Sequence, residues 1–371
     1  MTTTTAATDS SDRLHLGFVT NFFVPSLGMN TYFLCRELGR LGINVTLFAS
    51  EKYGKKKPLP EEEIAYEQPF KLVRVPTRFI LGNMPIYRGL MKLLQENGPY
   101  DILQTEDSYQ PYSMTVASFA KKNKIPLVLR HDLFEVPPFP YSEVFHFTEQ
   151  LYGINVAKSS RLAVVPIEEA GRYLRLLNPD IDYRVIPYGV EMKPVQVKRE
   201  KNSILTVARL IKDKGILDLL DALAIVKESV PDLHLTLIGR GPLQYEVEKK
   251  LVSLGLSSTL IPFVHHDRLG EFYSKASLFV LPSYHEAPNL AVPEALSCGT
   301  PIVASAIPGI KCYFQEDCGI LIDPGNVRGL ALSIETMLNL INRGMSFEPK
   351  DFSWPGIAKK YQMIYEEILR S

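Results

Sequence analysis

The sequence has few cysteines, no excess charge of either sign and no long apolar run. Its four cysteines among 371 residues form no C-x-x-C pair, which argues against a disulfide-stapled secreted module and favours a reducing, cytoplasmic setting. No apolar stretch approaches the roughly 18 residues that span a bilayer, so no transmembrane helix is predicted. Residues 1–12 lack the basic and apolar segments of a secretion signal and are predicted to form a disordered tail.

Lysine plus arginine and aspartate plus glutamate each number 41. This balance excludes a global field that would recruit nucleic acid, so any basic site must be local. Hydrophobic residues make up 46% of the chain and charged residues 22%, which is typical of a soluble globular protein. The length is too great for one ordinary core and predicts two domains.

Short apolar, β-rich runs alternate with longer amphipathic stretches along most of the chain. This pattern predicts an α/β fold in which crossover helices join the strands of parallel sheets. Residues 13–190 are expected to form one Rossmann-like domain and residues 203–350 a second, with the polar, lysine-rich segment 191–202 as linker and 351–371 as a closing amphipathic helix. Because open α/β sheets bind ligands at the carboxyl ends of their strands, we expect the active site in a cleft between the two domains.

The segment 278–304, LFVLPSYHEAPNLAVPEALSCGTPIVA, predicts a buried strand, a short loop, a helix and a second strand. Asn289 is a good N-cap residue, so Leu290 is expected to open the helix, whose free N–H groups form an anion site. Glu286 lies in the loop and Glu294 leans toward the same helix end, so both carboxylates can accept hydrogen bonds from hydroxyls of one ligand. The alternative is that both are solvated surface acids.

Within this segment, SYHEAPNLAVPEALSCGTPIVAS resembles the E-x7-E signature of the retaining glycosyltransferases of family four (group 1 type), which have the GT-B fold. The resemblance runs through most of the chain. It implies transfer of a hexose from a nucleotide diphosphate-sugar to an acceptor, with retained anomeric configuration and without a metal. It also implies that Glu286 contacts the transferred sugar, that Glu294 contacts the ribose, and that the amides of Asn289 and Leu290 contact the phosphates.

Two cations follow a predicted strand in ILTVARLIKDKG, with Arg209 directly after the strand and Lys214 five residues later. Paired positive charge at a strand end suits a diphosphate, and the alternative is a solvated helix start. The segment resembles the family's G-R-x-x-x-x-K-G element, with Ala208 in place of the first glycine. The resemblance implies that both side chains bind the leaving diphosphate.

Three glycines and one histidine resemble further family elements. Gly239 and Gly241 in IGRGPL are similar to a turn that lines the nucleotide pocket, although such turns also serve as plain strand-to-helix connections. Gly28 in FVPSLGMN is similar to part of a proline-then-double-glycine loop near the donor, with methionine where the second glycine usually stands. His131 ends a predicted strand in LVLRHD; a lone histidine is often structural, but the match implies that it positions the transferred sugar.

No residues with convincing metal-ligand spacing are present. Asp180-Ile181-Asp182 is interpreted as a polar turn before a strand, and the adjacent His265 and His266 are expected to face apart. We therefore expect no metal and no cofactor other than the nucleotide-sugar as co-substrate. Charge on the leaving diphosphate would be neutralised by Arg209, Lys214 and the helix end.

Two segments of the first half lie where this fold usually builds its acceptor side. The lysine-rich Gly54–Pro60 and the apolar-basic Met84–Leu94 are either an ordinary loop and helix or a patch for anionic lipid or a lipid-linked acceptor. The resemblance implies that the closing helix of 351–371 crosses back to the first domain. A lipid-linked or cell-surface glycan, with peripheral membrane contact and no nucleic acid, is the expected partner. The alternatives are a nucleotide-sugar epimerase, a phosphorylase with a pyridoxal cofactor, or an inactive nucleotide-sugar-binding scaffold of the same fold.

Overall fold

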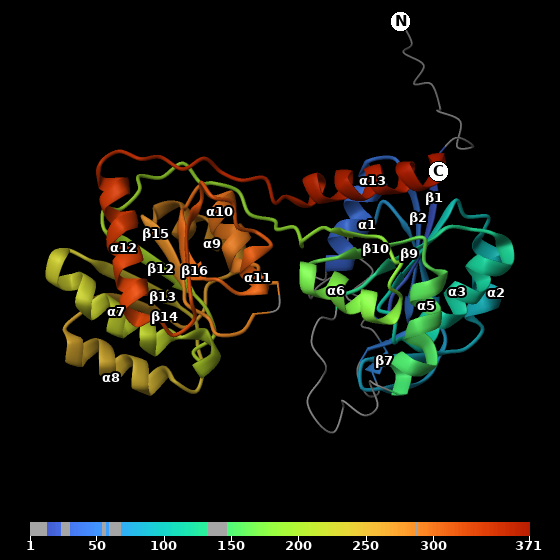
Figure 1. Cartoon of the computed structure of the whole chain (residues 1–371), viewed down its shortest axis with the longest axis horizontal. Coiled ribbons are helices and arrows are strands. Elements are labelled where there is room, and N and C mark those ends of the chain that lie inside the picture. Colours follow the sequence, from blue (N-terminus) through green and yellow to red (C-terminus); the bar gives the residue numbers. More distant parts are fainter. Residues whose placement is uncertain (1–12, 24–29, 54–56, 59–67, 133–146, 287) are drawn as a thin grey trace, which may run out of the picture. The chain divides into compact units, whose positions relative to one another are not determined.

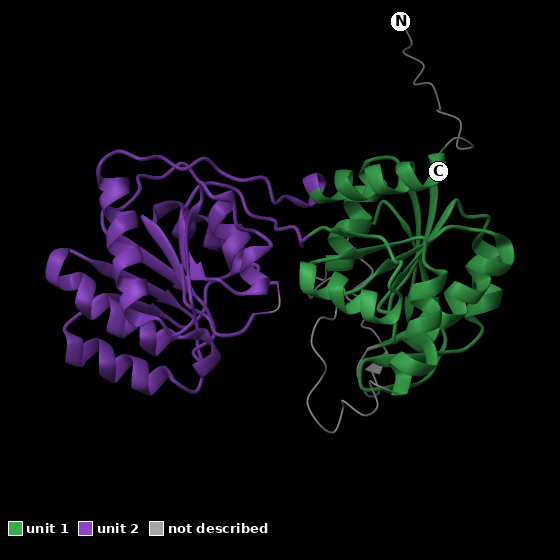
Figure 2. Ribbon diagram, viewed as in Figure 1, with its two compact units in different colours: residues 1–186, 357–371 green, residues 187–356 purple. Residues whose placement is uncertain are grey.

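A computed structural model describes residues 13–23, 30–53, 57–58, 68–132, 147–286 and 288–371. The chain forms two compact units (Figure 2). Unit 1 comprises Met1–Ile186 and Ile357–Ser371, and unit 2 comprises Pro187–Gly356. Each unit is a parallel sheet with helices, so the predicted fold class, two Rossmann-like α/β domains, is confirmed.

The unit boundaries differ from the predicted ends at residues 190 and 350. The segment from Pro187 belongs with unit 2, because Val190 forms a β-bridge with Ser353 and is buried in the same apolar cluster as Met192 and Phe352. Residues 191–200 have no regular secondary structure, but they lie within unit 2 rather than forming a separate body. Residues 191–200 therefore lie along the surface of unit 2, where we expected a linker between the two domains.

Unit 1 is built on a seven-stranded sheet in the order β11-β10-β9-β8-β1-β2-β5. All neighbouring strands pair in parallel. Buried runs such as that of residues 162–165, LAVV, form strands because apolar and β-branched side chains can pack on both faces of a covered parallel sheet. The strands are β1 (His15–Val19), β2 (Asn44–Ser50), β5 (Lys71–Val75), β8 (Ile102–Glu106), β9 (Leu127–Arg130), β10 (Leu162–Val165) and β11 (Tyr183–Val185).

Helices cover this sheet on both faces (Figure 1). They are α1 (Asn30–Arg40), α2 (Leu90–Asn97), α3 (Pro111–Asn123), a π-helical turn (Glu149–Gly153) that continues into α5 (Ile154–Ser159), and α6 (Glu168–Leu177). The last helix, α13 (Trp354–Arg370), packs on unit 1 from Ile357 onward, and its Tyr365 hydroxyl donates to Gln104 Oε1 at 2.6 Å.

Two small antiparallel hairpins complete the described part of unit 1. They pair β3 (Lys52–Tyr53) with β4 (Lys57–Pro58), and β6 (Thr77–Leu81) with β7 (Met84–Tyr87). The stretch Met84–Leu94 is therefore not one helix, because its first four residues form β7 and α2 starts only at Leu90.

Unit 2 contains a six-stranded parallel sheet in the order β14-β13-β12-β15-β16-β17. Its strands are β12 (Ser203–Val207), β13 (His234–Ile238), β14 (Ser257–Ile261), β15 (Leu278–Leu281), β16 (Ile302–Ser305) and β17 (Gly319–Ile322). Its helices are a short 3-10 turn (Lys212–Lys214), α7 (Ile216–Ser229), α8 (Gln244–Leu254), α9 (His266–Lys275), α10 (Ala291–Ser297), α11 (Pro308–Lys311) and α12 (Val327–Asn342).

Side chains of alternating strand residues divide the core of unit 2 into two clusters, because successive residues of a strand point to opposite faces. Ile204 and Val280 pack with α7, α8 and α12, whereas Leu205 and Leu281 pack with α9, α10 and α11. The two helix groups lie on opposite sides of the sheet (Figure 1).

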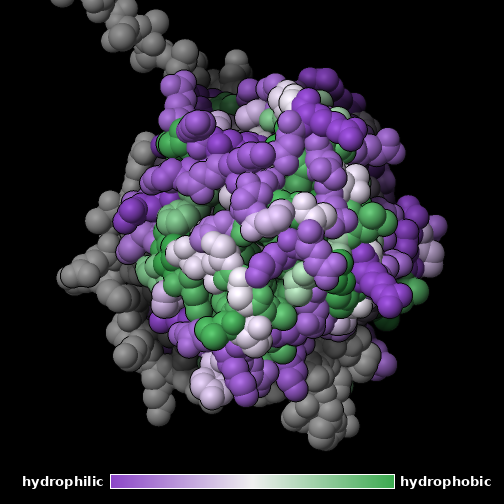
Figure 3. Space-filling view, turned by 90° about the vertical axis from the view of Figure 1, so that its left-hand side faces the viewer, coloured by the Kyte–Doolittle hydropathy of each residue, from purple (hydrophilic) through white to green (hydrophobic). Residues whose placement is uncertain are grey.

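The outer surface over α7, α8 and α12 is mainly polar with scattered apolar side chains (Figure 3). Exposed apolar residues on these helices include Ile225, Val252 and Leu332. Among the described helices, none combines the length and the apolar content that crossing a membrane requires.

Candidate active site

In unit 2, the predicted site residues follow three neighbouring strands at their carboxyl ends. Arg209 and Lys214 follow β12, Gly239 follows β13 and Glu286 follows β15, and β12 lies between the other two strands. Parallel strands end at the same edge of a sheet, so the fold brings these residues to one edge.

Lys214 and Glu286 form an ion pair. Lys214 Nζ lies 2.5 Å from Glu286 Oε2, and the two side chains are only 11% and 7% exposed. The Ser283 hydroxyl donates to the other carboxylate oxygen at 2.7 Å. Sequence reasoning placed Lys214 on a diphosphate and Glu286 on a sugar, and it did not foresee that the two side chains pair with each other.

Gly215 makes this pairing feasible. It has a φ of +61°, and a Cβ at this position would lie 2.2 Å from the carbonyl oxygen of Pro282. A glycine is therefore required for the chain after Lys214 to approach the loop that leads to Glu286. The Tyr284 amide also donates to the Asp213 carbonyl at 2.8 Å, which joins the two loops directly.

Gly239 and Gly241 serve close backbone packing. A Cβ at Gly239, whose φ is +152°, would lie 1.8 Å from the Ala208 carbonyl oxygen, and one at Gly241 would lie 2.4 Å from that of Leu210. The amide of Leu210 donates to Arg240 O at 3.0 Å. The two glycines thus hold the turn after β13 against the loop that carries Arg209.

Arg209 is exposed and lines a pocket of about 280 Å³. The other walls come from the ends of β12 and β13, from the loop that leads into α9, and from α9 itself. They comprise Val207, Ala208, Ile238, Gly239, Arg240, Pro262, Phe263, Val264 and Leu269. An apolar hollow beside guanidinium groups can hold a flat heterocycle attached to an anion.

The helix expected to start at Leu290 is α10, and it starts at Ala291 with Leu290 as its N-cap residue. Asn289 still satisfies one free helix amide, because its Oδ1 accepts from Val292 N at 3.2 Å. The Asn289 amide, which we expected at a phosphate, donates to the Gly309 carbonyl at 3.1 Å instead. The side chain of Asn289 therefore caps α10, and its backbone amide makes a tertiary contact.

Glu294 lies in α10 and is 5% exposed. Its Oε1 is 2.9 Å from His266 Nε2, and its Oε2 accepts from the Tyr273 hydroxyl at 2.8 Å. Both partners come from α9. The alternative that Glu294 is a solvated surface acid does not hold, because its carboxylate is buried and bonded to two side chains. Sequence reasoning missed both partners because they are distant in the chain.

In unit 1, His131 follows β9 and is fully buried. Its Nδ1 accepts a hydrogen bond from the Ser108 amide at 3.3 Å, so its proton is on Nε2. Burial lowers the pKa of His131 to about 4. No hydrogen-bond partner for Nε2 is present among the described residues. A buried neutral imidazole with an available N–H donor is suited to binding a hydroxyl.

Three residues around His131 were not foreseen. The Ser108 hydroxyl donates at 2.7 Å to Glu149 Oε1, and Glu149 is buried in the π-helical turn. Burial raises the pKa of Glu149 to about 7. Tyr173 stacks on His131, with ring centroids 5.8 Å apart and planes at 5°. A π-helical turn is frequent at functional sites, but its sequence carries no signal that would single out Glu149.

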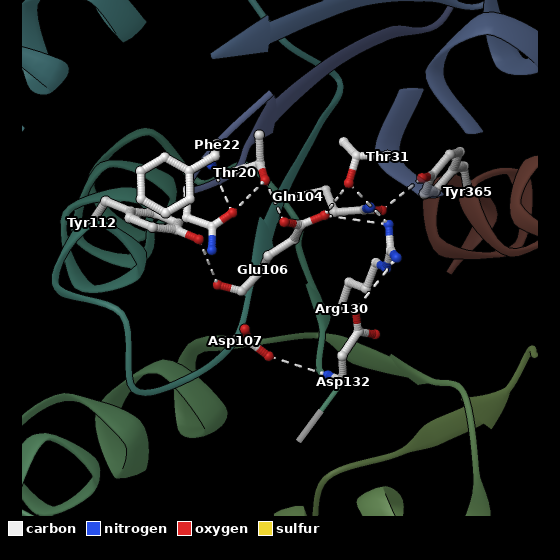
Figure 4. Close-up of polar contacts among 11 residues, drawn as sticks. Thr20, Phe22, Thr31, Gln104, Glu106, Asp107, Tyr112, Arg130, Asp132 and Tyr365 are labelled. Atoms are coloured by element: carbon white, nitrogen blue, oxygen red, sulfur yellow. Dashed lines mark hydrogen bonds and ion pairs between the residues drawn. The ribbon is translucent and has the colours of Figure 1, made fainter. Parts of the chain in front are cut away.

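A buried polar network lies beside His131 at the same strand ends (Figure 4). Glu106, at the end of β8, accepts hydrogen bonds from the hydroxyls of Thr20 and Thr31 and pairs with Arg130 at 3.2 Å. Burial raises the pKa of Glu106 although Arg130 opposes this shift. Asp107 Oδ1 accepts from the Asp132 amide at 3.1 Å. This network connects the ends of β1, β8 and β9 and so fixes the backbone that carries His131.

The remaining predicted positions are accounted for as follows. Gly28 lies outside the described residues, as do Lys55 and Lys56. The carboxylate of Asp182 pairs with Arg184 at 2.8 Å. His266 bonds to Glu294, while the ring of His265 lies against Phe263, so the two imidazoles have different surroundings. Within the described part of the chain, no group of three or more histidine, cysteine or acidic residues is arranged to hold a metal ion.

Two family models match consecutive parts of the chain. The model for "Glycosyltransferase Family 4" matches residues 28–193, and that for "Glycosyl transferases group 1" matches residues 190–347. The chain belongs to the group 1 glycosyltransferases. Its parallel sheets in two units match the GT-B fold of solved glycosyltransferases.

Among curated relatives of this group 1 glycosyltransferase, the sulfoquinovosyl transferase SQD2 of Arabidopsis thaliana is 23% identical over 66% of the chain. That match spans 52% of the plant protein, about half its length. The D-inositol 3-phosphate glycosyltransferase of Xylanimonas cellulosilytica is 25% identical over 92% of both chains. Among solved structures, Anabaena HepE in complex with UDP and glucose superposes with a TM-score of 0.61 at 15% identity, covering 96% of this chain and all of that one.

Proposed function

We propose that the chain is a retaining, metal-independent hexosyltransferase. It moves a hexose from a nucleotide diphosphate-sugar to a hydroxyl of a lipid-linked or cell-surface glycan, in the cytoplasm or at the cytoplasmic face of a membrane. The observation that carries the proposal is the arrangement at one sheet edge of unit 2. An apolar pocket adjoins Arg209 there, and Lys214 and Glu286 form an ion pair at the same sheet edge, in the loops that follow the neighbouring strands β12 and β15.

The side chains divide the donor between them. The apolar pocket receives the base, Arg209 binds the diphosphate as a fork, and Lys214 binds it as a point charge. An ammonium group has three donors, so Lys214 can keep its bond to Glu286 and still bind a phosphate oxygen. Glu286 then offers its remaining lone pairs to hydroxyls of the hexose, and Glu294 offers its own to the ribose.

The reaction breaks the bond between the anomeric carbon and a diphosphate oxygen. The acceptor oxygen forms its new bond on the same face of the sugar, and its proton passes to the departing phosphate oxygen. Fixed positive charge at Arg209 and Lys214 stabilises the leaving diphosphate as negative charge develops on it. His131, whose Nε2 carries a proton, donates a hydrogen bond to a hydroxyl of the transferred sugar.

Two further observations support the choice of ligands. HepE, which shares the fold, is described with UDP and glucose bound, so uridine is the first base to test. On the acceptor side, Phe79 and Leu81 of the β6–β7 hairpin are 59% and 52% exposed, and the neighbouring Arg78 is also exposed. Exposed apolar side chains beside a cation suit contact with an anionic lipid surface or a lipid-linked acceptor.

Binding and transfer are tested separately. UDP, GDP, ADP and their hexose derivatives are screened by thermal shift in EDTA, and the best donor is then incubated with candidate acceptors. Proton NMR of the product should show the same anomeric configuration as the donor. An inverted product, or turnover that vanishes in EDTA and returns with Mg²⁺ or Mn²⁺, would contradict the proposal.

A further inference from the structure

One face of α9 reaches both the apolar pocket and Glu294. His266, Leu269 and Tyr273 are spaced by three and four residues, so they lie on one side of the helix. Leu269 lines the pocket beside Arg209. His266 and Tyr273, on either side of it, each bond to one oxygen of the Glu294 carboxylate, at 2.9 Å and 2.8 Å. The helix that forms a wall of the pocket therefore also holds the carboxylate of α10.

The two contacts differ in their surroundings. Tyr273 is fully buried in the apolar cluster of α9, α10 and α11, and its hydroxyl can only donate to a carboxylate. The side chain of His266 is 56% exposed, whereas that of Glu294 is 7% exposed. One partner is thus a fixed neutral donor, and the other can exchange protons with solvent.

We propose that His266 and Tyr273 are positioning residues that orient the Glu294 carboxylate toward the ribose hydroxyls of the donor, and that protonated His266 adds positive charge to the nucleotide site. This inference rests on the proposed function. Each carboxylate oxygen has two lone-pair sites. With one site on each oxygen occupied from α9, one site on each remains for the two hydroxyls of a ribose.

Three acidic groups of the described residues act on His266. They are Glu294 on α10, Glu191 in the segment before β12 and Asp267 on α9. The hydrogen bond to Glu294, followed by these charges, raises the pKa of His266 above its ordinary value. A bound diphosphate adds further negative charge, so we expect its affinity to fall as His266 loses its proton with rising pH.

The orientation is tested with Tyr273→Phe, which removes one hydroxyl and leaves the buried ring in place. UDP, GDP and ADP are first titrated into the wild-type chain by calorimetry, and the tightest binder is compared with its 2′,3′-dideoxy form. We expect Tyr273→Phe to weaken the ribose form roughly tenfold, the scale of a hydrogen bond to a charged group, and to leave the dideoxy form unchanged. Tyr313→Phe, in the same buried cluster but without a bond to Glu294, is the matched control.

The charge is tested with His266→Gln and His266→Ala. Glutamine retains a neutral N–H donor, so His266→Gln should keep the preference for the ribose form, whereas His266→Ala should reduce it. The ratio of the Kd of His266→Gln to that of the wild type should be larger at pH 6 than at pH 8.5, because ionisation of the ligand cancels in this ratio.

The outcomes separate this inference from the proposed function. If the wild-type chain binds none of the three nucleoside diphosphates, the proposed nucleotide site is wrong. If it binds one and prefers ribose, but Tyr273→Phe and His266→Ala keep the full preference, the positioning role is wrong. A Kd ratio for His266→Gln that does not change with pH overturns the role of the histidine charge.

Discussion

At the scale of single residues, the carboxylates of Glu286 and Glu294 have different partners. Glu286 is held by Lys214 and Ser283, and Glu294 by His266 and Tyr273. The two alanine variants, Glu286→Ala and Glu294→Ala, should therefore differ from each other in their effects on ligand binding and transfer. Glu294→Ala should weaken a free nucleoside diphosphate by about tenfold to a hundredfold, because a charged hydrogen bond contributes about 1.5–3 kcal/mol.

Glu286→Ala should spare the free diphosphate, because the hydroxyl partners proposed for Glu286 belong to the hexose and because the change leaves Lys214 available to phosphate. It should instead slow transfer or weaken the intact sugar donor. Calorimetric titration of both variants with diphosphate and donor, beside their turnover, measures each effect. Equal loss of diphosphate affinity in two folded variants would contradict this division of roles.

His131 gives a second prediction, on pH. Its pKa in the folded chain is about 4, below the ordinary 6.5, because burial disfavours the charged ring. The unfolded chain therefore takes up this proton first as the pH falls, and stability is lost between pH 6.5 and 4, by about 3 kcal/mol at the lower end. Urea unfolding of the wild type and His131→Gln across this range isolates the effect. Parallel pH profiles for the two proteins, or an NMR titration of the ring near pH 6.5, would refute it.

Some of these residues could be found from sequence and others could not. Arg209, Lys214, Glu286 and Glu294 stand in local sequence patterns, so the sequence alone could single them out as candidates. Glu149, Tyr273 and Ser283 could not be identified, because each is defined by a contact rather than by its neighbours. The bond from Ser108 to Glu149, for example, joins residues 41 positions apart.

At the scale of elements, the turn after β13 depends on glycine. Gly239→Ala should destabilise the fold by about 2–4 kcal/mol, because the backbone is strained for any side chain and the new methyl group would overlap the Ala208 carbonyl. Gly344, which also has a positive φ but no neighbour within 4 Å of an added Cβ, is the control. Gly344→Ala should cost only about 1–2 kcal/mol. Equal losses for both variants in urea unfolding would show that the close packing at Gly239 contributes nothing.

The element pattern itself was predictable, and the exceptions have physical reasons. Buried β-rich runs predict strands, and amphipathic stretches predict helices, wherever the element packs against a single hydrophobic core. The helix expected over Met84–Leu94 is interrupted because Pro85 and Tyr87 lie in a short hairpin. There, pairing with β6 outweighs the helical spacing of the apolar residues. The start of α10 is shifted by one residue, and helix ends are commonly uncertain by this amount.

At the scale of the whole molecule, the described residues that the proposed function assigns to the nucleotide belong to unit 2. A free nucleoside diphosphate should therefore slow hydrogen exchange in residues 207–215, 238–243 and 262–269, which surround the pocket and the Lys214–Glu286 pair. The sheet of unit 1 should be unchanged. A ligand at 100 times its Kd adds about 2.7 kcal/mol to the state that binds it, which is ample for detection.

The same experiment tests independence from metal. In the proposed function, Arg209 and Lys214 supply the positive charge that a divalent ion would otherwise provide, so protection by UDP, GDP or ADP should be equal in EDTA and in Mg²⁺. The double variant Arg209→Ala/Lys214→Ala is the control and should lose the protection in both buffers. Protection that appears only with Mg²⁺, or that spreads over the sheet of unit 1 rather than the pocket of unit 2, would show that the diphosphate binds elsewhere or by another means.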